Sequence, residues 1–501
     1  MADLTDEQLR NIQGLGLAGF RKDIQDLIGV RFRSADAGRR LLKVATPLTA
    51  NAWEVRAFNA LFSEIRRRTG GMERIVEATW HGLLISAKGY SVLGVNTNEL
   101  PAGEGSAAFA SGMLGRAAQI GDTRPTDSPD QWLDAFRDGG LHALIVLASD
   151  SRDDLDEALD ALHKQIEATG CEQVWYERGE TLPDALRGHE HFGFKDGVSQ
   201  PSIAGFEPPP EADEPTAVAL GEFVLGYPDE TGNAGAGPVG DLWSDGSFVV
   251  FRRLCQDVAA FRAQVAAQVP DADPQLTPEQ LAAKLVGRWP SGTPTAVSPD
   301  ADPGESGVTN AFAFADDGDG VKTPRFSHIR KANPRDEDRP DAAGDPTQRH
   351  RMIRRGAPFG QPLPAGAAQD DGAERGLHFI CVVADLARQF EFVQRNWLNE
   401  PNFPNGGAPG TPGGPYTQPA PGIPADGPDP IVGEHEGGAQ VTLRQANDGV
   451  HPFALQAQFV RMTGGEYFFL PSIGALARLA DGATASTAQA PAAPAAQAAA
   501  P

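Results

Sequence analysis

Apolar positions along the chain follow two spacings, the period of two that is typical of strands and the period of 3.6 that is typical of helices. The segments 24–32 and 79–93 are rich in β-branched and aromatic residues and predict strands. The segments 35–45 and 51–68 carry the helical spacing. The first part of the chain therefore predicts a mixture of strands and amphipathic helices.

The second half of the chain continues this alternation. GEFVLGY (221–227) and GSFVVFRRL (246–254) predict two strands, and TPEQLAAKLVG (277–287) predicts a capped helix. QFVRMTGGEYFFLPSI (458–473) predicts a closing strand, a turn and a further strand. These segments indicate a second sheet.

A short internal match relates the two halves. GLHALIVLA (140–148) and GLHFICVVA (376–384) are identical at five of nine positions without a gap. Each copy predicts a strand, and each runs into a predicted helix, over 151–168 in the first half and 385–398 in the second. Nine residues can match by chance, but the shared helix favours duplicated α+β domains.

Length, composition and charge limit the class of protein. A chain of 501 residues is long enough for two domains, and 40% hydrophobic with 22% charged residues is typical of a soluble globular protein. The formal net charge of −24 disfavours nucleic acid and anionic membranes as partners. The three cysteines, Cys171, Cys255 and Cys381, form no CxxC pair, so we expect neither a disulfide framework nor a cysteine zinc site. No signal peptide or long apolar run is evident, and we expect a cytoplasmic protein.

The segment GFKDG (193–197) places an acid between glycines. Glycines on either side would let the backbone turn sharply and present Asp196 to a ligand. An isolated GxxDG is more often a turn with a solvated acid. Turn residue, metal ligand and proton carrier are therefore all open for Asp196.

Two basic segments are unusual in so acidic a chain. FSHIRKANPR (326–335) embeds His328 among arginines and a lysine, and QRHRMIRRGAPFG (348–360) places paired arginines before a Gly-x-Pro-Phe-Gly turn. Such bases can hold a phosphate or carboxylate group, and a neutral imidazole among them can ligate a metal. Both segments are also compatible with solvated basic loops. The sequence contains no HExxH pair, which argues against a zinc hydrolase.

In this order, GFKDG, FSHIRKANPR, RRGAPFG, GLHFICVVADLARQFEFVQ and GGEYFFLPS resemble the dye-decolourising peroxidase family of haem enzymes. The resemblance runs from about residue 11 to 478. It implies an α+β fold of two ferredoxin-like domains with haem in the C-terminal one. Residues 1–205 would form the first domain and contribute the GxxDG segment, residues 206–478 would form the haem-binding domain, and the Ala/Pro-rich 479–501 would be a disordered tail.

On the proximal side of haem b (iron protoporphyrin IX), the resemblance implies that His328 ligates the iron. Glu391 resembles the carboxylate that accepts the N–H of this imidazole. Arg330 or Arg335 could pair with a haem propionate, which is an inference from their charge rather than from a motif.

On the distal side, Asp196 matches the family's acid and Arg354 its arginine, while Leu377 and Phe379 match apolar residues of the pocket. Cleavage of hydrogen peroxide requires a proton to move between its oxygens while negative charge builds on the departing one. Asp196 could carry the proton and Arg354 could stabilise the charge. An acid where many other peroxidases use histidine predicts activity that favours acidic pH.

Three functions are compatible with these residues. The first is a haem peroxidase that oxidises dyes, phenols and other aromatic donors with hydrogen peroxide, and Trp175, Tyr176, Trp397 and Tyr467 are candidates to relay electrons. The second is a haem carrier or a protein that releases iron from haem, and the third is a haem-free binding protein. The pairing of an acid with an arginine favours the peroxidase, because a carrier needs no proton shuttle. The sequence does not predict an oligomeric state.

Overall fold

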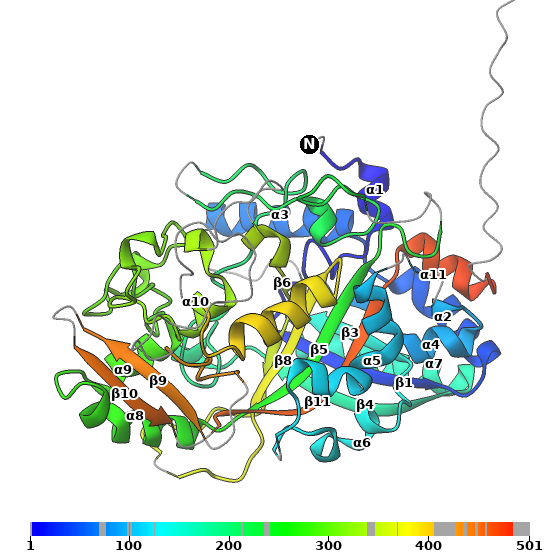
Figure 1. Cartoon of the computed structure of the whole chain (residues 1–501). Helices are drawn as coiled ribbons and strands as arrows, with labels where there is room; N and C mark the ends of the chain where they lie inside the picture. Colours follow the sequence, from blue (N-terminus) through cyan, green and yellow to red (C-terminus); the bar gives the residue numbers. More distant parts are fainter. Residues whose placement is uncertain are drawn as a thin grey trace, which may run out of the picture.

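Antiparallel strands close into a barrel in the computed structural model of the chain (Figure 1). Neighbouring strands follow the order β5-β11-β2-β3-β1-β4-β7-β8, and β8 pairs back onto β5. The structure describes residues 3–69, 77–97, 100, 103–124, 126–211, 214–234, 241–337, 346–367, 369–404, 426–433, 438–445, 449–455 and 458–483. The strands of the barrel and its short edge are β1 (Ile24–Phe32), β2 (Trp80–Ser86), β3 (Ala143–Ser149), β4 (Cys171–Glu180), β5 (Ser247–Gln256), β6 (Ile353–Arg354), β7 (Ala357–Phe359), β8 (Gly376–Val383) and β11 (Val460–Leu470).

Each half of the chain supplies four strands that lie side by side in the barrel, and the two sets have the same strand order. In the first half the sheet order is β4-β1-β3-β2, so the fourth strand of the unit lies beside the first, followed by the third and the second. In the second half the order is β11-β5-β8-β7, which again places the fourth strand beside the first, followed by the third and the second. This is the arrangement of a ferredoxin-like βαββαβ unit. The matched segments form β3 and β8, the third strand of each unit, so the predicted duplication and the α+β fold of two ferredoxin-like domains are confirmed.

The two units join through their edge strands. Phe468 of β11 lies opposite Ser86 of β2, and Gly179 of β4 lies opposite Phe359 of β7. Edge strands expose unpaired backbone groups, and pairing each edge with the other unit satisfies them. β1 and β3 are buried at almost every position, because the barrel interior covers one face and packed helices cover the other.

Most of the described helices cover the barrel, and three of them belong to a smaller lobe beside it. They are α1 (Asp6–Asn11), α2 (Ala35–Ala45), α3 (Ala52–Thr69), α4 (Ala87–Leu93), α5 (Glu104–Ile120), α6 (Asp134–Arg137), α7 (Arg152–Thr169), α8 (Val258–Ala272), α9 (Pro278–Val286), α10 (His328–Ala332) and α11 (Ile473–Ala480). The predicted capped helix is confirmed as α9, where Thr277 and Gln280 form a reciprocal capping box. After β8, the two π-helical segments Ala387–Glu391 and Val393–Leu398 take the place of the predicted helix.

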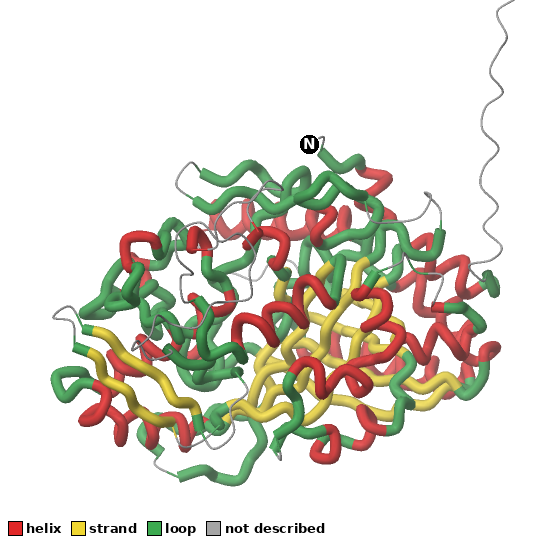
Figure 2. Tube along the Cα trace, in the orientation of Figure 1, coloured by secondary structure: helices red, strands yellow, loops and turns green. Residues whose placement is uncertain are grey.

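A smaller lobe stands beside the barrel. It contains the paired strands β9 (Ala439–Arg444) and β10 (Val450–Leu455), which Figure 2 shows apart from the main group of strands. Helices α8 and α9 pack with these strands around a separate apolar cluster that includes Phe261, Phe326 and Phe453. This lobe carries α10, whose first residue is His328.

Three predicted elements differ from the structure. The segment 79–93 is a strand, β2, only as far as Ser86, and its second half forms the helix α4 (Ala87–Leu93). The segment 221–227 is not a strand, because Phe223 and Val224 fill the main core from a loop of turns, and their burial alone produced the strand-like pattern. The segment 458–473 holds one continuous strand, β11, rather than two strands and a turn. Its Gly464 lies at an irregularity of the register, where a Cβ atom would come within 2.4 Å of the Phe136 ring. Close packing, not a turn, therefore requires that glycine.

The tail predicted to be disordered lies almost wholly outside the described residues, which end at residue 483. Of the helices that the structure describes, none is long and apolar enough to cross a bilayer.

Candidate functional site

His328 begins helix α10 and is held by a buried carboxylate. Its Nδ1 lies 2.7 Å from Oδ2 of Asp429. The other oxygen of Asp429 accepts hydrogen bonds from the backbone amides of Ile431 and Val432, at 2.7 and 3.1 Å. The carboxylate is therefore fixed in place. This contact occupies Nδ1 and leaves Nε2 of His328 as the nitrogen that can coordinate a metal.

The electrostatics of this pair favour a charged carboxylate beside the ring. Burial by itself lowers the pKa of His328, but the charge and hydrogen bond of Asp429 outweigh it and raise the pKa above its ordinary value. Burial likewise raises the pKa of Asp429, and the imidazole together with the two amides brings it below its ordinary value. The His328 side chain is 35% exposed while that of Asp429 is wholly buried. An open imidazole with an anionic partner behind it is the arrangement of an iron ligand.

The prediction for Glu391 is wrong. Its carboxylate is bound by Arg116, with Nε at 2.9 Å, and by the hydroxyl of Tyr467 at 3.0 Å. Asp429, not Glu391, accepts the N–H of the His328 imidazole. The sequence offered little signal for Asp429, which lies in the Gly/Pro-rich segment 426–433 and is 101 residues from His328.

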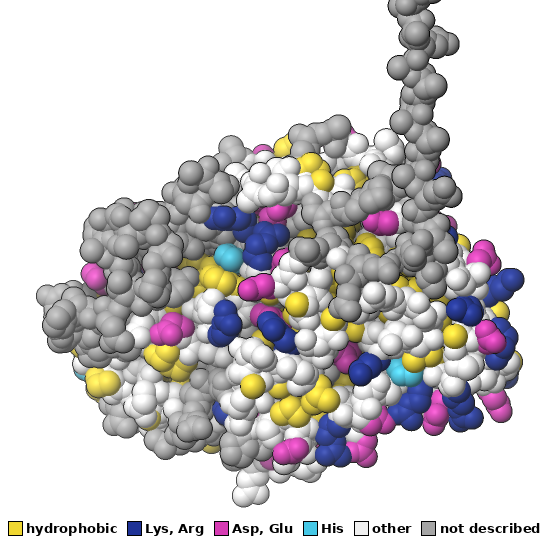
Figure 3. All heavy atoms as spheres, turned by 45° about the vertical axis from the view of Figure 1, so that its right-hand side comes forward, with side chains coloured by type: hydrophobic (Ala, Val, Ile, Leu, Met, Phe, Trp, Pro, Cys, Tyr) yellow, Lys and Arg dark blue, Asp and Glu magenta, His cyan; other side chains and the backbone are white. Residues whose placement is uncertain are grey.

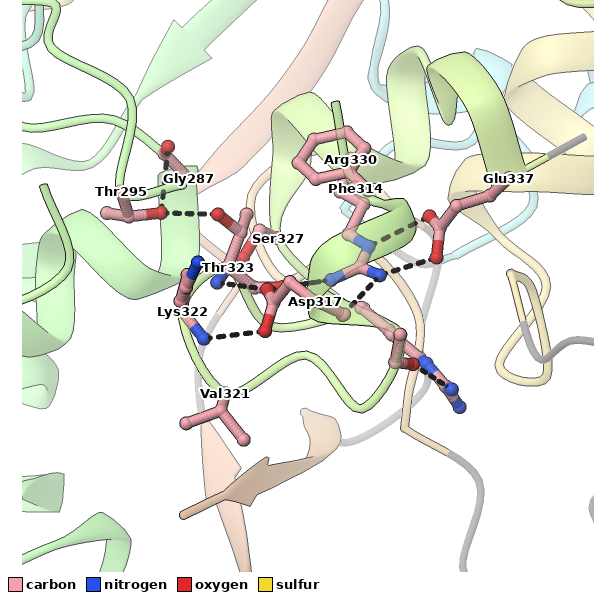
Figure 4. A network of polar contacts seen from close by, with 12 residues as sticks. Gly287, Thr295, Phe314, Asp317, Val321, Lys322, Thr323, Ser327, Arg330 and Glu337 are labelled. Carbon is pink, nitrogen blue, oxygen red and sulfur yellow. Dashed lines mark hydrogen bonds and ion pairs between the residues drawn. The ribbon is translucent and has the colours of Figure 1, made fainter. Parts of the chain in front are cut away.

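The prediction that Arg330 pairs with a haem propionate is also wrong. This guanidinium is fully buried, and Figure 4 shows it enclosed by two carboxylates. Its Nε donates to Glu337 at 2.8 Å and its Nη1 to Asp317 at 3.2 Å, and backbone carbonyl groups take further donors. Arg330 thus anchors α10, and with it His328, instead of facing a ligand.

Arg335 remains a candidate for the propionate. It lines a cavity of about 520 Å³ together with Arg351 and Gln348. Burial, followed by the charges of Arg351 and Arg288, lowers its pKa to about 9. Its Nη1 donates to the carbonyl groups of Asn310 and Phe312, at 2.9 and 3.0 Å. Glu214 and Asp336 also line this cavity, so its charge is mixed, and the pairing of Arg335 with a propionate stays a prediction.

The segment that directly follows Asp196 is hydrogen-bonded to Arg354. The side-chain amide of Gln200 pairs with the backbone of Arg354 in both directions, at 3.1 and 3.2 Å, and Nη2 of Arg354 donates to the carbonyl of Ser199 at 3.1 Å. Asp196 itself is exposed and accepts from the amide of Gly197 at 2.6 Å, the local bond of a tight turn. Beyond the effects of burial and Asp429, the charge of Arg354 lowers the pKa of His328 and that of Asp196 raises it. The three groups therefore belong to one electrostatic site.

β8 supplies an apolar wall with two faces. Leu377 and Phe379 point to one side and are half-buried, whereas His378 and Ile380 point to the other and are buried. Nε2 of His378 lies 2.7 Å from the carboxylate of Glu177, which gives this histidine a structural role. The half-open side of the strand is the one that can meet a flat apolar ligand.

These residues fit an iron porphyrin. The contact at Nδ1 leaves Nε2 of His328 for the iron, Leu377 and Phe379 are half-buried apolar side chains, and Arg335 is a cation seven residues from His328. Within the described ranges, no group of three or more His, Cys, Asp or Glu side chains could hold a metal ion by itself. A single imidazole serves a haem iron because the porphyrin supplies the other ligands.

Comparisons with known proteins decide the family. A family model described as the DyP dimeric alpha+beta barrel domain matches residues 11–181. Peroxidase 2 of Mycetinis scorodonius is 32% identical over 420 residues, which cover 79% of this chain and 75% of that protein. The chain belongs to the dye-decolourising peroxidase family.

Other relatives agree with this assignment. A multifunctional dye peroxidase from Amycolatopsis sp. is 31% identical over 437 residues, covering 81% of this chain and 84% of that protein. The solved structure of an ancestral D-type dye-decolourising peroxidase superposes with a TM-score of 0.79 at 30% identity, covering 95% of this chain and 99% of that one. The dye-decolourising peroxidase of Pleurotus ostreatus, solved as a mutant, gives 0.80 at 28% identity, with 94% and 99% covered. The chain is therefore a peroxidase of a family of haem enzymes that oxidise dyes and other aromatic compounds.

Proposed function

We propose that this dye-decolourising peroxidase holds haem b through Nε2 of His328, with Asp429 fixing the imidazole. The 2.7 Å contact between the two side chains and the open face of the ring support this role. The bound iron would supply the redox chemistry. Asp429 keeps the proton on Nδ1, so that Nε2 stays unprotonated and faces the cofactor.

Asp196 and Arg354 would cleave hydrogen peroxide on the opposite face. The Asp196 carboxylate accepts a proton from one oxygen of the peroxide and delivers it to the departing oxygen, which leaves as water. The Arg354 guanidinium stabilises the negative charge that develops on that oxygen. The hydrogen bonds of Ser199 and Gln200 to Arg354 support this assignment, because they tie the arginine to the segment that carries the acid.

Each of the two ferredoxin-like domains would contribute part of the site. Residues 1–205 contribute Asp196, and residues 206–478 contribute His328 and Arg354, so the site forms where the two ferredoxin-like domains meet. The boundary between residues 205 and 206 falls in the long connection from β4 to β5. Neither domain carries the full set of groups alone.

Small aromatic compounds would be the electron donors, and hydrogen peroxide the oxidant. A dye-decolourising peroxidase with a TM-score of 0.76 and 28% identity has been solved in complex with 2,6-dimethoxyphenol, which supports phenols as donors. Of the four aromatic residues considered for electron relay, Trp397 and Tyr467 are buried, Trp175 is half-buried, and Tyr176 is 37% exposed. Tyr176 is therefore the one that a bulky dye could touch.

The test is to mix the ferric protein with one equivalent of hydrogen peroxide and record absorption spectra by stopped flow. We expect a rapid change of the haem bands, slowed about 100-fold or more in Asp196→Asn and in Arg354→Leu. Asp160→Asn is the matched control, because Asp160 is exposed on α7. Haem bands that do not respond to peroxide would point to a haem carrier, and equal rates in all four proteins would refute the roles of Asp196 and Arg354.

A further inference from the structure

A cavity of about 340 Å³ borders Arg354. Its walls come from the segment 15–25, which leads into β1, from residues 353–357 around β6 and β7, and from the segment that follows Asp196. His328 does not line it. The cavity thus shares one wall with the proposed peroxide-cleaving residues but does not include the proposed iron ligand.

One side of the cavity is apolar. Leu15, Phe20, Pro201, Ile203 and Ile353 all line it, and each of these side chains is buried. Its volume lies at the lower end of the range for small-molecule sites, roughly 300–1,000 Å³, which suits one aromatic ring. A ligand that packs against this wall needs a flat apolar body.

The other side is cationic. Arg21, Arg354 and Arg355 line the cavity, and within the described ranges none of them has a carboxylate at ion-pair distance. Lys22 also lines it but is paired with Asp150 at 2.7 Å. Over the face drawn in Figure 3, by contrast, acidic and basic side chains lie interspersed. Three arginines without an ion-pair partner among the described residues, against the one carboxylate of Glu207 in the same lining, form a local site for an anion in a chain with a net charge of −24.

The structure holds Arg355 in this position through backbone contacts. Its guanidinium donates to the carbonyl groups of Leu15 at 3.2 Å, Gly16 at 3.3 Å and Arg354 at 3.2 Å, and also to that of Leu17. Within the described residues this leaves one N–H of Nη1 for a ligand. Gly19 permits the close approach, because a Cβ atom there would lie 2.6 Å from Nε of Arg355. Burial, followed by the charge of Arg21, lowers the pKa of Arg355 to about 9, with a smaller opposing effect from Glu207. The carboxylate of Glu207, the acidic residue of the lining, accepts from the amide of Ile203 at 3.2 Å.

A buried polar atom in the same wall points to a ligand independently. Gln25 lines the cavity and is only 7% exposed, yet its Oε1 has no hydrogen-bond partner in the part of the chain that the structure describes. An unpaired buried acceptor costs about 1–3 kcal/mol, so such atoms are normally satisfied. A hydroxyl group on a bound molecule would satisfy it.

We propose that this cavity binds a small single-ring aromatic acid, with its carboxylate at Arg21 and Arg355, its ring on the apolar wall and a ring hydroxyl at Gln25. The occupant then lies against Arg354, so a hydroxybenzoate-type acid is a donor that the enzyme selects by charge. The argument for binding of the acid uses the cavity alone, whereas its role as an electron donor rests on the proposed function.

Calorimetry on the ferric holoprotein without peroxide tests the binding, with 4-hydroxybenzoate and its neutral methyl ester as probes. We expect the acid to bind about tenfold more tightly than the ester at low salt, and more weakly as salt is added. Arg21→Gln and Gln25→Leu should each weaken binding of the acid several-fold, and Arg21→Gln should leave the ester unaffected. Arg461→Gln is the matched control, because Arg461 is an exposed arginine on β11 that does not line the cavity.

Equal affinities for acid and ester would overturn the proposal, as would equal losses in Arg21→Gln and Arg461→Gln. Displacement of 4-hydroxybenzoate by acetate at the same concentration would show a general anion site and overturn the aromatic specificity. Steady-state kinetics then tests the donor role: Arg21→Gln should raise KM for the acid by about the same factor as its affinity falls. The peroxide reaction without a donor is recorded separately, so failure of the peroxidase chemistry is distinguishable from failure of the binding site.

Discussion

Replacing Asp429 with asparagine removes the charge behind the His328 imidazole while keeping the shape of the side chain. In the native protein one carboxylate oxygen accepts from the imidazole, and the other accepts from two backbone amides. Asparagine has one acceptor oxygen and one NH₂ donor. Whichever way the amide turns, its NH₂ group meets a donor, either the imidazole N–H or the amides of Ile431 and Val432.

This conflict sets the expected magnitude. If the NH₂ group faces the imidazole, it favours the tautomer with the proton on Nε2, the nitrogen needed for iron. If it faces the backbone, two buried donors lose their acceptor. Loss of such a partner of a metal ligand typically lowers affinity or activity about 10–100-fold. For haem affinity this corresponds to about 1.4–2.7 kcal/mol.

The assay is a haem titration of the haem-free protein, followed by the growth of the Soret band, for the native chain and for two variants. Asp429→Asn should bind haem about 10–100-fold more weakly. Glu391→Gln is the control, since Glu391 is engaged by Arg116 and Tyr467 and should leave haem affinity unchanged. Normal affinity in Asp429→Asn together with weakened affinity in Glu391→Gln would refute the assignment drawn from the structure.

Three further predictions concern stability and electron transfer. Arg330→Met leaves two buried carboxylates without their cation, so the free energy of unfolding in urea should fall by about 3–5 kcal/mol, and a loss below 1 kcal/mol would contradict the anchoring role. Burial raises the pKa of Glu466 from 4.5 to about 7, so its contribution to stability is complete below pH 4.5 and is lost as the pH rises through 7. Glu466→Gln should therefore lose less stability than the native chain between pH 5 and 8, and parallel pH profiles would rule this out. Tyr176→Phe should lower turnover of a bulky dye without changing the reaction with peroxide, and unchanged dye turnover would remove Tyr176 as a relay.

Patterns among residues close together in the sequence predicted much of the fold and of the candidate site. The apolar residues along the chain predicted β1, β5, α2, α3 and α9: the helices show one apolar face at the helical spacing, and the strands are short runs of mostly apolar residues because both of their faces are buried. The match between β3 and β8 predicted two related units. His328, Asp196 and Arg354 were predicted because each lies in a short motif whose residues are adjacent in the chain.

The sequence did not predict which residues of distant segments come into contact. The partner of His328 is Asp429, 101 residues away, and no local rule selects that acid among the 67 acidic residues of the chain. A cluster of bases around His328 was compatible with a surface loop or with a ligand site, and only the packing showed that Arg330 is buried between carboxylates while Arg335 lines a cavity.

The sequence by itself predicted most of the strands and helices, and it predicted a duplicated α+β chain with an acid, an arginine and a histidine in its motifs. The tertiary structure alone decided that the two sheets close into one barrel, which carboxylate holds the histidine, and where a cavity lies beside Arg354. The reason is that secondary structure depends on neighbours along the chain, whereas ion pairs, cavities and closure depend on which remote segments pack together.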